Sequence, residues 1–183
     1  MTKEMKTHFD DRTKMHIKLV QKYMGKIINI DKQFQALKKR MSKHDASKFR
    51  GTEYIPYVFI TWMYKCQRDG VEWEIPDGMK DKATKATIHH MLSNKHHPEY
   101  WDKNFDADDM FNAENRDGTP AKMVDGAEME PLSIAEMIAD WCAVAEERKT
   151  NPNDWLNANV NKRWKFTDLQ VKFMKTLLKK IWE

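Results

Sequence analysis

The chain has 183 residues, 40% of them apolar and 11% aromatic, a composition that excludes a disordered protein and suits one domain with a substantial core. Its net charge of +4 is too small to indicate a nucleic-acid-binding protein, although it is compatible with an anionic ligand. The longest uncharged apolar stretch, residues 54–64, is far shorter than the roughly 20 residues of a membrane span, and no secretory signal is visible at the start. We therefore expect a single cytoplasmic domain over residues 1–183, without membrane association and with its oligomeric state left open.

Two helical segments are predicted at the start of the chain. One face of the first is marked by residues at steps of four, three and four: His16, Val20, Tyr23 and Ile27. The second has a similar face: Phe34, Leu37, Met41 and His44. Residues 29–31 offer a turn between them, with Asp31 as the cap of the second helix. An antiparallel pair of helices is the predicted beginning of the fold.

Helical periodicity continues along the chain. A third helix is predicted from Pro56 to about Arg68, where Asp69-Gly70 ends it. Its expected buried residues are Phe59, Trp62, Met63 and Cys66. A fourth helix is expected over residues 80–94, whereas residues 102–131 show little periodicity and predict a long surface insertion.

Three more helices are predicted after this insertion. The fifth runs from Ser133 to about Arg148, with an inward face that consists of Ile134, Met137, Ile138, Trp141 and Ala145. A short sixth helix begins near Asn153, and the last begins at a capping box formed by Thr167 and Gln170. The predicted fold is therefore all-α, a bundle of about six to seven helices without internal repeats.

The residues 43–49, "KHDASKF", place a histidine and an aspartate side by side near the end of the second segment. His16 precedes Ile30 by 14 residues, and His44 follows Ile30 by 14. In an antiparallel hairpin that turns near Ile30, both histidines would lie roughly 21 Å from the turn and point inward. Since imidazole and carboxylate are common ligands of divalent ions, His16, His44 and Asp45 form a candidate metal site.

A second group of histidines lies in "IHHMLSNKHHPEYW", residues 88–101, which contains four of the seven histidines of the chain. His90 and His97 are seven residues apart, as are His89 and His96, so each pair would share a face of a continuous helix. Pro98 disfavours helical backbone at His97, which places the second pair just beyond the helix end. The residues alone do not decide which member of each pair is a ligand.

Asp140, in "EMIADW", lies beside the buried face of the predicted fifth helix. Because a buried carboxylate without a partner is costly, Asp140 needs a salt bridge or a metal ion.

The order His16, His44-Asp45, His90, His96/His97 and Asp140 on an all-α chain resembles the HD-domain metalloenzyme superfamily. The motifs "HDASKF", "HHMLSNKHHPEYW" and "EMIADW" further resemble an uncharacterised bacterial and phage family within it. The resemblance covers about residues 8–148 and leaves out the C-terminal helices, about 153–183. The chain lacks a Gly-Tyr-Pro segment after the histidines, unlike cyclic-dinucleotide enzymes, and lacks the acidic pair of stringent-response nucleotide hydrolases.

This resemblance implies a site for one or two divalent ions, which could be Mn, Fe, Mg, Co or Zn. One ion would be held by His16, His44, Asp45 and Asp140. Asp45 would bridge to a second ion, held by His90 and by His96 or His97, while Lys48 would face an anionic substrate. We expect Asp45 and Lys48 to be the catalytic residues.

The function expected on this basis is hydrolysis of a small phosphate ester, most plausibly a nucleotide, through a water activated by the ions. Two alternatives stay open. Some HD proteins use nearly the same ligands as di-iron oxygenases, and a non-catalytic binding protein with a structural metal is also compatible with the sequence.

Overall fold

The computed structural model describes residues 1–108 and 122–182. The described part of the chain is mostly helical, with two strands of two residues each, which confirms the all-α prediction. The α-helices are α1 (Lys3–Ile30), α2 (Leu37–Met41), α3 (Gly51–Asp69), α4 (Met79–Ser93), α6 (Pro131–Arg148), α7 (Pro152–Asn159) and α8 (Asp168–Ile181). The short 3-10 helices are η1 (Lys32–Ala36), η2 (Ala46–Phe49) and η3 (Pro98–Tyr100), and the strands are β1 (Val124–Asp125) and β2 (Trp164–Lys165).

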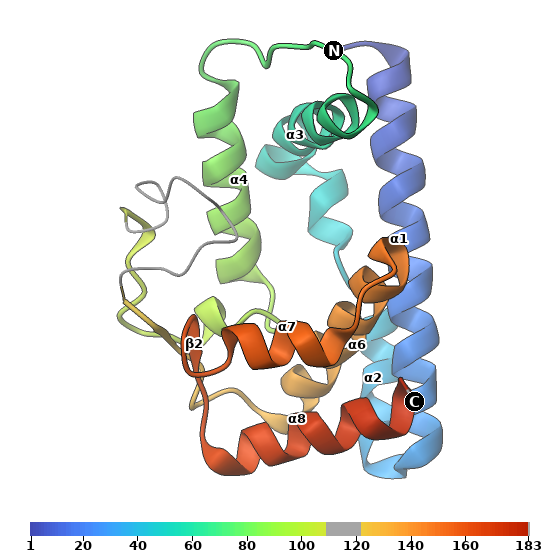
Figure 1. Cartoon of the computed structure of the whole chain (residues 1–183), viewed down its shortest axis with the longest axis vertical. Coiled ribbons are helices and arrows are strands. Elements are labelled where there is room, and N and C mark those ends of the chain that lie inside the picture. The colour runs from blue at the N-terminus through green and yellow to red at the C-terminus, as the bar shows by residue number, and fades with distance from the viewer. Residues whose placement is uncertain (109–121, 183) are drawn as a thin grey trace.

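The long helix α1 organises the molecule. It runs along one edge for the full height of Figure 1, with α4 on the opposite side and α3 crossing between them in the upper half. Helices α6, α7 and α8 lie in the lower half, where α6 and α8 contact α1. The predicted inward face of α1 is confirmed, since His16, Val20, Tyr23 and Ile27 are all buried.

Two hydrophobic clusters pack against different parts of α1. The first joins the start of α1 to α3 and α4 and contains Met5, Phe9, Tyr57, Val58, Phe59 and Ala86. The second joins the later turns of α1 to α6, α7 and α8, and begins on α1 at Val20. The buried residues of α1 between Phe9 and Val20 are polar, namely Thr13 and His16. A buried polar centre therefore lies at the level where the two hydrophobic clusters meet.

The second predicted helix is shorter than expected. The side chain of Asp31 accepts a hydrogen bond from the Gln33 N–H, as its predicted role as a cap requires, but the chain first forms the 3-10 helix η1. Helix α2 then ends at Met41, so His44 lies in the turn that follows and not on a helix. The turn nevertheless brings His44 beside α1, because the apolar face of Phe34 and Leu37 packs in the core.

Helix α3 begins at Gly51 and not at Pro56 as predicted. Gly51 has a φ of +54°, a backbone conformation that glycine adopts easily and that lets the chain turn into the helix early. The predicted end at Gly70 is confirmed, whereas Trp62 and Met63 are only half-buried. The earlier start adds a turn that buries Glu53, which contacts the histidine group.

The prediction of a surface insertion over residues 102–131 is wrong near its end, while residues 109–121 of it lie outside the described part. Val124 is buried in strand β1, which pairs in parallel with β2, and Met129 is buried in the core. Strands of two residues are too short to produce the alternating pattern by which strands are found in a sequence. Helix α6 likewise begins at Pro131, two residues before the predicted Ser133.

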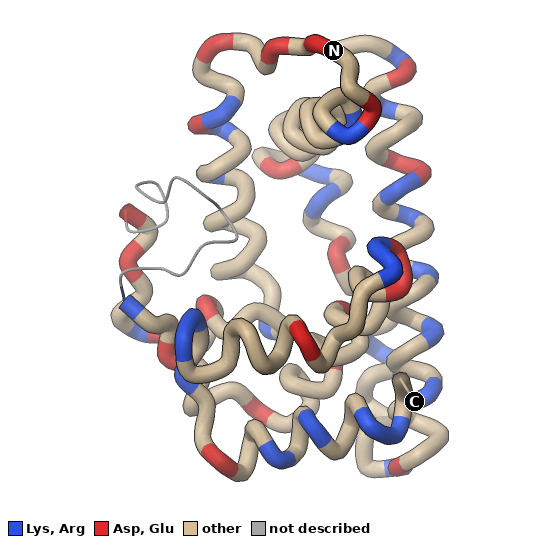
Figure 2. Tube along the Cα trace, viewed as in Figure 1, with Lys and Arg blue, Asp and Glu red and all other residues tan. Residues whose placement is uncertain are grey.

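The C-terminal helix α8 is packed on the rest of the molecule. Its predicted capping box between Thr167 and Gln170 is present, and Leu177, Leu178 and Ile181 are buried. Lysines recur along α8, while acidic and basic residues are otherwise interspersed over the described elements (Figure 2). The lysines of α8 are exposed, namely Lys172, Lys175, Lys179 and Lys180. No helix in the described ranges is long and apolar enough to cross a membrane.

Candidate metal centre

Four segments bring the predicted ligands together. His16 comes from α1, His44 and Asp45 from the turn after α2, and Asp140 from α6. His90 lies in the last turn of α4, and His96 and His97 follow the end of that helix, as Pro98 predicts. The rings of His16 and His44 have their centroids 6.0 Å apart, so the expectation that these two histidines lie at the same level is confirmed.

The first donor group contains His16, His44 and Asp45, whose donor atoms all lie within 4.8 Å of one another. Asp140 joins it, because its Oδ1 lies 2.9 Å from Nε2 of His16 and 4.0 Å from Nε2 of His44. Asp45 Oδ2 lies 3.6 Å from Nε2 of His16. All four residues implied as ligands of the first ion are therefore adjacent.

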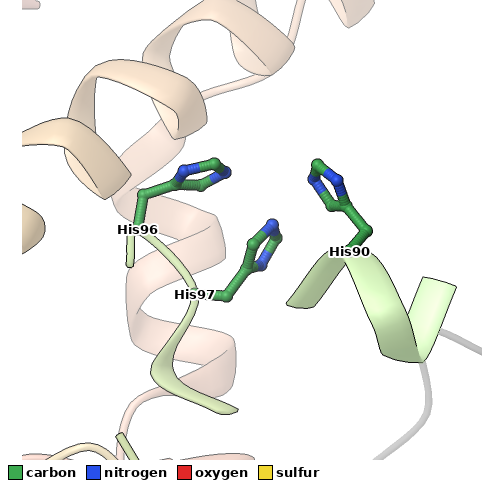
Figure 3. A group of neighbouring side chains, drawn as sticks. All are labelled: His90, His96 and His97. Carbon is green, nitrogen blue, oxygen red and sulfur yellow. The ribbon is translucent and has the colours of Figure 1, made fainter. Parts of the chain in front are cut away.

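The second donor group contains His90, His96 and His97, again with donor atoms within 4.8 Å of one another. Figure 3 shows the rings of His96 and His97 turned toward the ring of His90, which reaches them from α4. Asp45 Oδ1 lies 3.1 Å from Nε2 of His90 and 3.8 Å from Nε2 of His96. Asp45 is thus close to both groups, and both His96 and His97 lie within reach of an ion beside His90.

Asp45 is held in an unusual backbone conformation. Its φ of 56° and ψ of 11° lie in the left-handed region, which aspartate tolerates better than most residues. Residues in such conformations cost on the order of 1–3 kcal/mol and persist where surrounding structure fixes them. Asp45 is almost fully buried, with 2% of its side chain exposed, between the two donor groups.

Three glutamates outside the predicted set of ligands bind Nδ1 of three of these histidines. Glu147 Oε1 lies 2.9 Å from Nδ1 of His16, Glu136 Oε1 lies 3.0 Å from Nδ1 of His44, and Glu53 Oε2 lies 3.0 Å from Nδ1 of His90. A carboxylate only accepts hydrogen bonds, so each Nδ1 donates and each Nε2 is left to face the centre. Carboxylates in this outer position are typical of histidines that bind metals.

The sequence contains a signal for two of these glutamates. Glu136, Asp140 and Glu147 are spaced by four and seven residues, so they share one face of α6. The sequence contains no such signal for Glu53, because Glu53 precedes Pro56, the predicted start of the third helix.

Several buried atoms of the centre have no hydrogen-bond partner. Among the described residues these include Nε2 of His44, Nε2 of His90, Nε2 of His97 and Oδ1 of Asp45. A buried polar atom without a partner typically costs about 1–3 kcal/mol. Imidazole nitrogens and a carboxylate oxygen that converge in this way fit a divalent ion, which would satisfy them together.

The two aspartates are ionised. Burial raises the pKa of the Asp45 carboxyl, but the Lys48 ammonium and the ring of His44 outweigh burial and hold that pKa well below its usual range. Burial also opposes ionisation of Asp140, whose hydrogen bond with His16 nevertheless lowers its pKa. Metal ligands must be deprotonated, and both carboxylates meet this requirement.

The pKa values of four histidines of the centre are shifted, in two directions. Burial lowers the pKa of His44, but the Asp45 carboxylate and the hydrogen bond to Glu136 outweigh burial and raise it. Burial, together with the charge of His44, lowers the pKa of His96, and burial together with His96 lowers the pKa of His97, so both rings are neutral at neutral pH. Burial also lowers the pKa of His16, but hydrogen bonds to Asp140 and Glu147 outweigh it and raise that pKa to about 9. In the metal-free protein the His16 ring is therefore protonated on both nitrogens at neutral pH, and a bound ion would displace one of these two protons.

Lys48 lies at the edge of the centre. Its Nζ is 2.5 Å from Oδ2 of Asp45, and 23% of its side chain is exposed. Burial lowers the pKa of Lys48, but Asp45 outweighs it and the net effect raises the pKa, so the ammonium stays charged. His89, in contrast, is 55% exposed and binds Glu53, outside both donor groups.

The chain belongs to a family of unknown function, DUF5662, whose model matches residues 5–181. The matched range contains every member of the two donor groups. No curated protein and no solved structure matches the chain.

Proposed function

We propose that this member of the DUF5662 family is a divalent-metal-dependent phosphohydrolase that acts on a nucleotide or a related phosphate ester. The observation that carries the proposal is the position of Asp45, 3.1 Å from His90 and 3.6 Å from His16, which suits one carboxylate shared by two ions. The resemblance of the His16, His44-Asp45 and Asp140 order to HD-domain metalloenzymes supports the same reading.

The proposed ligands of the first ion are His16, His44, Asp45 and Asp140, and those of the second are Asp45, His90 and His96 or His97. A set with so many imidazoles suits Fe or Zn better than Mg or Mn. Ions bound there would supply an activated water and neutralise charge on the phosphoryl oxygens.

The substrate is proposed to approach from the side where the centre is partly exposed. His44, Asp45, His90 and His96 are buried, whereas the side chains of Lys48, His97 and Asp140 are 23%, 25% and 19% exposed. The charged ammonium of Lys48 at this edge would bind and orient a phosphoryl oxygen, a role that needs a point charge and no proton transfer.

The test is a panel of nucleotides and generic phosphodiesters, offered to protein loaded with Mn²⁺, Mg²⁺, Fe²⁺ or Co²⁺. We expect release of phosphate or a nucleotide product with at least one ion, and none from Asp45→Ala. Oxygen consumption with an organic substrate and no hydrolysis would favour the di-iron oxygenase alternative. A protein that retains its ions but turns over neither class of substrate would be a metal-containing binding protein.

A further inference from the structure

We infer that Glu136 is a positioning residue shared by both ion sites, which it links by holding one histidine of each. Oε1 of Glu136 lies 3.0 Å from Nδ1 of His44 and 3.5 Å from Nδ1 of His96. His44 belongs to the first donor group, whereas His96 lies in the second and also has a donor atom within 4.8 Å of those of His44 and Asp140. One carboxylate oxygen therefore faces a histidine of the first group and a histidine at the junction of the two groups. The inference rests on the metal centre in the proposed function, but not on the reaction proposed for it.

The other two outer glutamates each serve one donor group. Glu147 contacts Nδ1 of His16, in the first group. Glu53 contacts Nδ1 of His90, in the second, and its other oxygen binds the exposed His89. These two glutamates are therefore natural comparisons for Glu136, because they make the same kind of hydrogen bond within a single site.

Glu136 is itself held in place by Arg40. The side chain of Glu136 is buried, and its Oε2 accepts a hydrogen bond from Arg40 Nη1 at 3.0 Å. Arg40 is fixed in turn by Glu130, at 2.6 Å, and by Ser133, at 2.8 Å. Because the guanidinium occupies Oε2, only Oε1 remains for the histidines, and its position is set by the α2–α6 contact.

The fixed position of Oε1 determines how the rings of His44 and His96 direct Nε2 toward the centre. When Nδ1 donates to Glu136, Nε2 carries the lone pair and the ring is oriented toward the centre. Loss of such an outer partner typically weakens metal binding by about 10- to 100-fold. Loss of Glu136 should therefore weaken both ions, whereas loss of Glu147 should weaken the first alone and loss of Glu53 the second alone.

Glutamine is the informative replacement because it keeps the shape of glutamate but has only one acceptor oxygen. In Glu136→Gln, the amide NH₂ must face either Arg40 or the histidines, all of which offer N–H donors, so one of these contacts is lost. Glu146→Gln is the matched control on the same helix, since Glu146 binds Lys22 and Tyr23 and none of the histidines.

The experiment measures Co²⁺ affinity for each ion separately by the visible absorption of bound Co²⁺. His90→Ala provides a background that retains the first ion, and Asp140→Ala provides one that retains the second. We expect Glu136→Gln to weaken Co²⁺ about 10- to 100-fold in both backgrounds. Glu147→Gln should weaken binding of the first ion only, and Glu53→Gln should weaken binding of the second ion only. Glu146→Gln should leave the affinity for both ions unchanged.

Weakening in only one background, or in neither, would overturn the shared role of Glu136 even if the parent hydrolyses phosphate esters. The expected pattern without any hydrolysis would instead leave the inference standing and count against the proposed function. If circular dichroism shows that Glu136→Gln unfolds, Arg40→Gln replaces it, because it removes the support of Oε2 and keeps the carboxylate. Unchanged Co²⁺ affinity of Arg40→Gln in both backgrounds would then overturn the inference.

Discussion

The carboxylate of Asp45 lies 3.1 Å from Nε2 of His90, although the two residues come from separate segments of the fold. Asp45 follows the short helix α2, whereas His90 lies in the last turn of α4, and neither position is set by local sequence spacing. Their contact joins the His-Asp pair and the later histidines into one centre.

Lys48 is expected to assist turnover without holding an ion. Its ammonium contacts Asp45 at the exposed edge of the centre, so Lys48→Met should lower kcat with a phosphate ester by about 10²- to 10³-fold, as loss of one charge that stabilises the transition state commonly does. Metal content should stay at the parent value. Lys43→Met, at an exposed position in the turn before η2, is the control and should match the parent. Equal kcat for Lys48→Met and the parent would remove Lys48 from the site.

Metal binding should strengthen as the pH rises toward about 9. The pKa of His16 in the metal-free protein is raised to about 9 by Asp140 and Glu147, against the opposing effect of burial. Below that pH the ring is protonated, and an ion must displace the proton to bind, so affinity should fall about tenfold for each pH unit lost.

Calorimetry in buffers with different ionisation enthalpies would count the protons released on Co²⁺ binding. We expect proton release at neutral pH from His16 and from His44, whose pKa values are both raised, and less release in His16→Ala. Binding without proton release at neutral pH would contradict the raised pKa of His16.

Two glycine substitutions should change stability in opposite directions. An added Cβ at Gly126 would lie 2.6 Å from the ring of Phe166, which is buried, so Gly126→Ala should destabilise the protein by about 1–3 kcal/mol. Gly25 lies within α1 with nothing within 4 Å of such a Cβ, and Gly25→Ala should stabilise it by about 0.5–1 kcal/mol. Urea denaturation measures both, and a destabilised Gly25→Ala or an unchanged Gly126→Ala would contradict the packing described.

The sequence predicts the parts of the structure that depend on local patterns. The inward face of α1, the end of α3 at Gly70 and the capping box of α8 follow from periodicity and from capping residues, which act over a few positions. The grouping of His16 with His44 was also predictable, because a hairpin relates positions equally distant from its turn.

The glutamates that bind the histidines of the centre could not be predicted in the same way. Their positions depend on contacts between segments that are distant in the sequence, and such contacts leave no local pattern. Glu53 reaches His90 only because α3 begins at Gly51, and His44 approaches Glu136 only because the turn after α2 faces α6. Strands β1 and β2 pair in parallel although they lie far apart in the sequence. Each strand has only two residues, which is too short to show an alternating pattern. Tertiary packing, and not propensity, sets these features.

Metal analysis of protein purified without chelator, beside Asp45→Ala, tests the central claim most directly. Since Asp45 faces both donor groups, we expect about two divalent ions for each parent chain and almost none for the variant, with helical content unchanged by circular dichroism. Asp11→Ala, which removes an exposed carboxylate from α1, should keep the parent content. A parent without bound ions after incubation with Mn²⁺, Fe²⁺, Co²⁺ or Zn²⁺, or an Asp45→Ala variant that binds as much as the parent, would contradict the account.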